Sequence, residues 1–157
     1  MSLVQYDPAA VNFYCGAHKI DGYAKDTFLE VARNSPTYTT VVGAQGHAVA
    51  VKSADRSGYI QLTLLQTSKG NQTLSALMTS SELAPGGVAF PVTVRDTLGN
   101  TICFCAAALI EKPADVRYDT SIKERVWKFL CGVLLMNVGG NSEIAIGDGS
   151  EGIEGGN

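Results

Sequence analysis

The sequence predicts a mainly β domain, a β-sandwich or partly open barrel with one flanking α-helix. Residues 58–65 alternate between apolar and polar side chains, which is the period of a strand with one buried face. The 157 residues include 17 glycines and only 17% charged side chains, as expected for a protein of strands joined by turns. A helical period of apolar residues is found only near residues 71–81.

The first half of the chain reads as an N-terminal arm, residues 1–10, followed by strands and turns. We expect strands at 10–20, 27–33, 37–42, 48–53 and 58–68. Asp21 and Gly22 end the first of these strands, and Pro36 follows the second. The loop 43–46 has two glycines between two segments of small and β-branched residues, which predicts a hairpin.

One helix follows. Asn71 is a suitable N-cap, and Pro85 ends the helical pattern. The residues spaced at i, i+3, i+4 and i+7 are Leu74, Leu77, Met78 and Ser81. Because this apolar stripe is narrow, we expect the helix to cover one side of a sheet.

Strands return in the second half, at 88–96, 101–111 and 124–137. The last of them has two distinct faces: one carries Val126, Lys128 and Leu130, and the other carries Trp127, Phe129 and Cys131. Residues 1–138 are therefore expected to form one β domain.

Residues 139–157 form a Gly-rich acidic tail, which we expect to be mobile or ordered only by a partner. The formal net charge is −3, and the tail has four acids and no Lys or Arg, so the body is about +1 (−3 plus 4). A nearly neutral body lacks the excess of Lys and Arg that favours binding to nucleic acid. Residues 147–152 spell G-x-G-x-x-G, but the five residues after them cannot complete a nucleotide-binding βαβ unit.

No catalytic, cofactor or metal site is predicted. The four cysteines are scattered, and the closest pair, Cys103 and Cys105, lacks the spacing of a metal-binding C-x-x-C motif. We interpret them as reduced core thiols of a cytoplasmic protein, because the first residues do not resemble a secretory signal. The apolar stretch 129–136 is too short to cross a bilayer. A small hydrolase using Cys131 or Cys15 with His18 remains an alternative.

Several segments in a fixed order resemble the tail tube proteins of contractile-tailed bacteriophages. The resemblance spans roughly residues 18–135, and the Gly-rich tail is not part of it. The segments that carry it are Lys19–Tyr23, Phe28–Pro36, Ser57–Ser68, Phe90–Val92, Asp96–Thr101, Lys112–Val116 and Arg125–Trp127.

The resemblance implies a virion protein, assembled in the cytoplasm of the bacterial host. Six subunits would form a ring in which their strands join one continuous barrel, and stacked rings would form a hollow tube. Genomic DNA would pass through the lumen without specific binding. The implied partners are further copies of the chain, the tail sheath, a baseplate or tube initiator and a tape-measure protein; the chain itself would not bind a membrane.

Two regions are the expected contact surfaces. The hairpin, the loop after it and the N-terminal arm have too little apolar content to be stable alone, so we expect contacts between subunits or rings there. The candidate residues are Thr37, Tyr38, Thr39, Val49, Val51, Asp55 and Arg56. The helix would face the sheath through Gln72, Thr73 and Thr79. The alternatives are a tail terminator, a capsid-decorating protein or a monomeric β-sandwich that binds a ligand.

Overall fold

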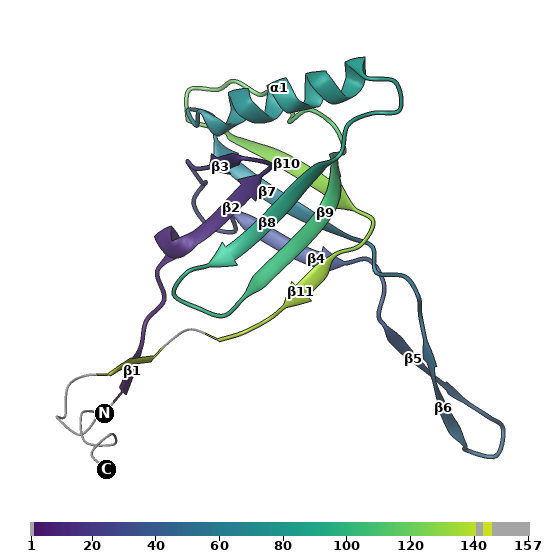
Figure 1. Ribbon diagram of the computed structural model, residues 1–157. Coiled ribbons are helices and arrows are strands. Elements are labelled where there is room, and N and C mark those ends of the chain that lie inside the picture. The colour runs from purple at the N-terminus through teal and green to yellow at the C-terminus, as the bar shows by residue number, and fades with distance from the viewer. Residues whose placement is uncertain (1, 141–142, 146–157) are drawn as a thin grey trace, which may run out of the picture.

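The computed structural model describes residues 2–140 and 143–145 (Figure 1). Its elements are β1 (Ser2–Val4), a 3-10 turn (Pro8–Ala10), β2 (Val11–Cys15), β3 (His18–Ile20), β4 (Leu29–Arg33), β5 (Tyr38–Val42), β6 (Ala48–Lys52), β7 (Gly58–Leu65), α1 (Gly70–Leu83), β8 (Phe90–Asp96), β9 (Ile102–Ile110), β10 (Glu124–Cys131), β11 (Leu135–Asn137) and β12 (Glu143–Ala145). The expected mainly β fold with one α-helix is confirmed for this part of the chain. None of its helices is long and apolar enough to span a membrane.

The main sheet is antiparallel, with strand order β3-β2-β8-β9-β10-β7-β4. Strand β10 pairs with the end of β9, at residues 108–110, and β11 pairs with its beginning, at residues 102–104. Both strands therefore lie along the same edge of β9. The sheet ends at β3 on one side and at β4 on the other.

This sheet curls on itself, so that β2, β8 and β9 lie in front of β4, β7 and β10 (Figure 1). Phe13 of β2 and Phe129 of β10 show the curl, because their ring centroids are 5.2 Å apart although two strands separate them in the sheet. Both rings are fully buried. The core between the layers is thus filled by inward-facing residues of strands that are not neighbours. The sheet is not closed into a barrel, and the arrangement is consistent with a β-sandwich, one of the two predicted architectures.

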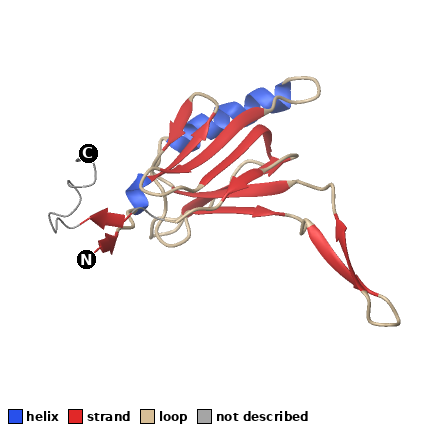
Figure 2. Ribbon diagram, turned by 60° about the horizontal axis from the view of Figure 1, so that its bottom comes forward, coloured by secondary structure: helices blue, strands red, loops and turns tan. Residues whose placement is uncertain are grey.

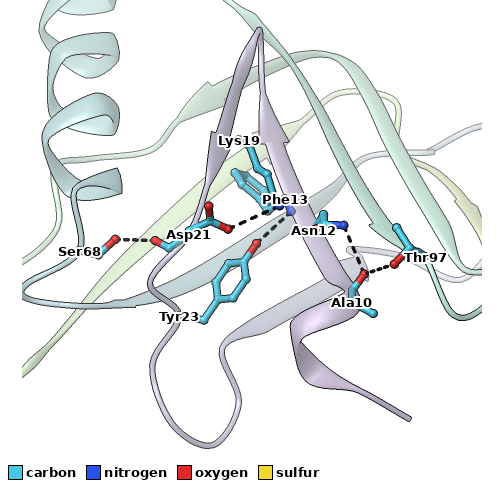
Figure 3. Close-up of polar contacts among 8 residues, drawn as sticks. All are labelled: Ala10, Asn12, Phe13, Lys19, Asp21, Tyr23, Ser68 and Thr97. Atoms are coloured by element: carbon cyan, nitrogen blue, oxygen red, sulfur yellow. Dashed lines mark hydrogen bonds and ion pairs between the residues drawn. The ribbon is translucent and has the colours of Figure 1, made fainter. Parts of the chain in front are cut away.

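Figure 3 shows how the loop after β3 is held against the sheet. The backbone N–H of Phe13 donates a hydrogen bond to the Tyr23 hydroxyl at 3.0 Å, and the Ser68 hydroxyl donates to the backbone carbonyl of Asp21. Tyr23 also forms a backbone bridge with Leu64 of β7. Burial raises the pKa of the Tyr23 hydroxyl to about 12, so it stays protonated at neutral pH. These contacts join the two layers at one end of the curl.

Helix α1 covers one open end of the curled sheet (Figures 1 and 2). Leu74 is fully buried, whereas most other helix positions are exposed or half-buried, in agreement with the narrow stripe. The prediction that Asn71 is the N-cap is wrong: the helix begins at Gly70, and Ser68 Oγ accepts the Gly70 N–H at 3.1 Å. Asn71 Oδ1 instead accepts the indole N–H of Trp127 at 3.0 Å. Its amide therefore ties the helix to β10.

Two of the expected strands are each divided. Residues 10–20 form β2 and β3, joined by a turn at Gly16, whose φ of 61° favours glycine. Residues 124–137 form β10 and β11, because Leu134 turns inward to be fully buried between them. The predicted faces of β10 are confirmed, since the set containing Trp127 is buried and the set containing Val126 lies outside.

The two ends of the described chain meet. Strand β1 pairs antiparallel with β12, with Ser2 opposite Ala145 and Val4 opposite Glu143. The sequence did not predict this pairing, since residues 143–145 fall in the tail expected to need a partner. The remainder of the tail, with its G-x-G-x-x-G pattern, lies outside the described residues.

Candidate assembly surfaces

The β5–β6 hairpin projects as a two-stranded ribbon away from the body of the molecule (Figures 1 and 2). Every residue of both strands is exposed. Val41 pairs with Val49, and Thr39 pairs with Val51, so these side chains share one face of the ribbon. The other face carries Tyr38 and its partner Lys52.

The hairpin buries none of its strand residues, yet it exposes several large apolar side chains. Tyr38 and Val42 are each 62% exposed, and the large apolar residues beside them are Val41, Val49 and Val51. An isolated two-stranded ribbon is marginally stable in water, and contiguous exposed apolar residues mark interaction sites. The hairpin therefore has the exposure and composition that are typical of a contact surface.

Hydrogen bonds fix the base of the hairpin to the body. The Arg33 guanidinium donates to the backbone carbonyl of Leu134 through Nε at 3.2 Å and through Nη2 at 2.9 Å. Its Nη1 donates to Thr37 Oγ1 at 3.3 Å, and the Leu134 N–H donates to the Arg56 carbonyl at 2.9 Å. One arginine thus connects the last residue of β4, the entry to β5 and the link between β10 and β11.

Asp55 closes the same base from the other strand. Its carboxylate accepts hydrogen bonds from Ser35 Oγ at 2.6 Å, Ser57 Oγ at 2.7 Å and the Ser57 N–H at 2.9 Å. These bonds, first that from Ser35, lower the pKa of Asp55 to about 2. The ionised carboxylate therefore ties the two connections of the hairpin, residues 34–37 and 53–57, to each other.

The structure divides the predicted contact residues into two groups. Tyr38, Thr39, Val49 and Val51 lie on the exposed ribbon, whereas Thr37, Asp55 and Arg56 lie at its base. The predicted set omitted Val41, which shares a face of the ribbon with Val49, and Val42, which lies on the same face as Tyr38. It also missed Arg33, for which no sequence signal exists because its partner is a backbone carbonyl distant in the chain.

A second apolar surface lies on the outside of the sheet over β9, β10 and β11. Leu109 and Leu130 are directly opposite each other and are 42% and 44% exposed. Phe104 and Leu135 form another pair of directly opposite residues, and they are 37% and 48% exposed. Sequence reasoning did not select these residues, although apolar side chains on both faces of residues 102–110 were the available signal.

The residues predicted to face the sheath lie in the first three turns of α1. Gln72 and Thr79 are exposed, and Thr73 is half-buried. No ionisable side chain lies between Gly70 and Ser81, so this part of the helix presents an uncharged polar surface. Such a surface offers hydrogen bonds to a partner without the cost of desolvating charge.

The cysteines lie in the core. All four are buried, and burial raises the pKa of Cys15 to about 11 and that of Cys131 to about 12. His18 pairs with Cys15 in the β2–β3 register, but its side chain is exposed. Protonated, enclosed thiols are poor nucleophiles. Among the described residues, no group of three or more His, Cys, Asp and Glu side chains is placed to hold a metal ion.

Residues 15–139 match the family model described as Bacteriophage PhiTE tail tube protein. The chain belongs to this family. The match includes the projecting hairpin, α1 and the whole main sheet from β3 onward. The resemblance seen in the sequence is thereby confirmed, and the chain is a structural tail tube protein and not an enzyme.

A curated relative is structural protein ORF10 of Pseudomonas phage KPP10. It is 24% identical over 131 residues, which cover 82% of this chain and 75% of the relative.

Solved structures share the fold at low identity. A sheath/tube terminator of the extracellular contractile injection system PVC has a TM-score of 0.61 at 13% identity, covering 85% of this chain and 97% of that one. The tube terminating cap of the anti-feeding prophage has a TM-score of 0.58 at 10% identity, covering 86% of this chain and 93% of that one. A chain of the extended PVC sheath-tube complex has a TM-score of 0.57 at 15% identity, covering 85% of this chain and 91% of that one.

Proposed function

We propose that this chain is the repeating subunit of a hollow phage tail tube. Six copies form a ring, rings stack into a tube, and genomic DNA passes through the lumen without specific binding. The tube grows in the host cytoplasm from a baseplate or tube initiator, around a tape-measure protein that sets its length. The proposal is supported by membership of the tail tube family.

The observation that carries the proposal is the exposed apolar hairpin. Its residues have no second layer within the described chain, yet its base is held rigidly by Arg33 and Asp55. A fixed, projecting apolar ribbon suits a permanent contact with another copy better than it suits a monomeric ligand-binding module. We assign Tyr38, Thr39, Val49 and Val51 to that contact, with Thr37, Asp55 and Arg56 holding the ribbon in position.

The ends of the main sheet support ring closure. Strands β3 and β4 are its terminal strands, so each leaves one edge without a ladder partner in this sheet. Unpaired strand edges tend to associate, and joining edges between copies around a ring removes them. Six such joints generate one continuous wall, wider than a barrel whose interior side chains fill.

The outside of the tube is assigned to α1. Its exposed uncharged residues, Gln72 and Thr79 with the half-buried Thr73 beside them, would face the sheath. Support comes from the fold shared with a chain of a sheath-tube complex. Sheath subunits would then meet a regular array of helices, one per copy, which is how a tube acts as a template.

Electron microscopy of the purified full-length chain tests the proposal. We expect rings with sixfold symmetry and, at higher concentration, stacked tubes with an open lumen. Sedimentation velocity provides a second measurement, because tube growth depends on concentration. A monodisperse monomer at high concentration would overturn the proposal.

A tube terminator is the second candidate, because two of the similar structures are a terminator and a terminating cap. The fold alone does not separate the two roles. A terminator would stop at a single ring that binds the end of a preformed tube. The family match favours the stacking subunit, and ring stacking in the same micrographs distinguishes them.

A further inference from the structure

A cavity of about 280 Å³ lies beside the first half of α1. Its lining comes from the helix, from the segment after β9 and from β10, and consists of Asn71, Gln72, Ser75, Pro113, Ala114, Val116, Arg125 and Trp127. Arg125 is the one charged residue among them. The cavity is therefore an apolar and amide-lined space with a single cation in its wall.

Arg125 is buried, with 7% of its surface exposed. In the described part of the chain its hydrogen bonds are two long ones from Nη1, to the carbonyls of Arg117 at 3.4 Å and Glu124 at 3.3 Å. Its guanidinium also lies 5.5 Å from the centroid of the exposed Tyr118 ring. The described ion pairs do not include Arg125.

The exposed lysines nearby show the opposite pattern. Lys112, Lys123 and Lys128 are each 40% exposed or more, and each has a carboxylate within 4 Å. An ion pair contributes little at such solvated positions, whereas a buried charge without a partner is costly. The buried Arg125 thus has no acidic partner within 4 Å among the described residues, whereas the three exposed lysines each have one.

A carboxylate is the ligand that this cavity suits. An arginine presents five N–H donors in a planar fork, which matches the two oxygens of a carboxylate. The hydrogen bonds from Nη1 leave Nε and Nη2 to make such a contact. The cavity also adjoins Asn71 and Gln72 in the first turn of α1, where the helix dipole favours negative charge.

We propose that the cavity binds a carboxylate from the acidic C-terminal segment of a second copy of this chain. Residues 143–157 contain Glu143, Asp148, Glu151 and Glu154 and no Lys or Arg. Strand β12, where this segment begins, lies at the end of the molecule opposite α1 (Figure 1). Because α1 is assigned to the outside of the tube, the acidic segment of one copy would cross the contact between rings along that outer surface to reach the cavity of the next copy.

The chain length permits this contact. Twelve residues follow Ala145 (157 minus 145), and an extended segment of that length spans up to about 40 Å. The inference rests on the proposed stacking of copies. It assigns to the acidic tail a role as an axial tie between rings, on the outer surface that α1 occupies.

Trp127 makes the test direct, because it is the only tryptophan of the chain and lines the cavity. The receptor is a full-length variant whose own acids are neutralised: Glu143→Gln, Asp148→Asn, Glu151→Gln and Glu154→Gln. The probe is a synthetic peptide of residues 143–157, which has no aromatic residue. We expect saturable changes in Trp127 emission as the peptide is added, weakening as salt is raised.

Three comparisons decide the inference. A peptide carrying the same four amide substitutions should bind at least about tenfold more weakly, and this comparison leaves the protein unchanged. Arg125→Gln in the receptor should have a similar effect, Arg125→Lys a smaller one, and the exposed neighbour Arg117→Gln almost none. Equal binding of the acidic and amide peptides, or no saturable binding at millimolar peptide, would overturn the inference.

The source of the carboxylate is decided with the wild-type chain. Occupation by a second copy predicts that Trp127 emission shifts as the protein assembles, in step with concentration. A shift already complete in dilute monomer would mean that the tail binds its own cavity, which contradicts the axial tie. If tubes form but the peptide does not bind, the axial tie is refuted and the proposed tube function stands. If the peptide binds but the chain never stacks, the proposed tube function is refuted.

Discussion

Strand β4 leads into β5, and β6 leads into β7. The antiparallel pairs β4–β7 and β5–β6 nevertheless have opposite environments. In β7 the residues Ile60, Leu62 and Leu64 are fully buried, whereas every residue of β5 and β6 is exposed. Both pairs are rich in β-branched and aliphatic residues. The difference is the second layer: β4 and β7 pack against the curled front of the sheet, and β5 and β6 extend past it. The apolar residues that pack against a second layer in β7 therefore have exposed counterparts in β5 and β6, where the described part of the chain provides no such layer.

The largest expected effect comes from placing charge on the hairpin. The double substitution Val41→Asp and Val49→Asp puts two carboxylates opposite each other on one face of the ribbon. We expect tube assembly to be abolished, because buried charges without partners are costly, while monomer stability stays within about 0.5 kcal/mol per site. Electron microscopy and chemical denaturation measure the two outcomes.

The matched control places two carboxylates on the other face, at Thr40→Asp and Ala50→Asp. If only the first pair prevents assembly, one face of the ribbon packs against the neighbour; if both do, the ribbon is enclosed. Normal tubes from the Val41 and Val49 variant would show that the hairpin is not a contact.

Removing core packing should unfold the body without any specific effect at the hairpin. Phe129→Ala removes a fully buried ring that lies 5.2 Å from Phe13, centroid to centroid. We expect a loss of about 3–5 kcal/mol in the free energy of unfolding, measured in urea. Val49→Ala on the ribbon should change it by less than about 0.5 kcal/mol. A similar loss at both positions would mean that the hairpin is part of the monomer core.

The rate of thiol labelling distinguishes the buried core from the exposed hairpin, and the substitution that it requires should perturb the fold less. With a pKa of about 11, Cys15 is ionised to about one part in a thousand at pH 8, and its burial blocks access as well. We expect a maleimide to label a ribbon cysteine, Thr39→Cys, at least about a hundredfold faster than the native thiols. Mass spectrometry of partially labelled protein measures this. Rapid labelling of Cys15 would indicate that the core opens readily.

The smallest effect is the pH dependence of the hairpin base. The pKa of Asp55 is about 2 in the folded chain against an ordinary 3.8, so its ionised form stabilises the base above about pH 4. That contribution declines as pH falls towards 2. The difference in Tm between wild type and Asp55→Asn should therefore be present at pH 6 and shrink between about pH 4 and pH 2. A constant difference would show that the three hydrogen bonds do not depend on the carboxylate charge.

Periodicity predicted the main sheet well, because alternation survives wherever one face is buried. Residues 124–131 show it clearly, with Trp127 inside and Val126 outside. Periodicity failed at points set by tertiary contacts. Nothing local marks Leu134 as the residue that turns inward and divides the last strand, and Gly16 gave the only hint that β2 and β3 are separate.

The assembly surfaces were only half predictable. The hairpin could be found because two segments of small and β-branched residues flank a loop with two glycines. Arg33 could not be found, since its role depends on a carbonyl about a hundred residues away. Asn71 shows a related limit: its sequence position suits a helix cap, but the indole of Trp127 takes its side-chain oxygen.

The pairing of β1 with β12 brings residues 2–4 and 143–145 together. A short peptide linker between residue 145 and residue 2 would thus make a circular permutant feasible, with new ends opened in the exposed loop 43–46. An enzyme or fluorophore fused at residue 2 or directly after residue 145 would leave each copy from the same site. In a stacked assembly it would be displayed once per subunit at regular intervals.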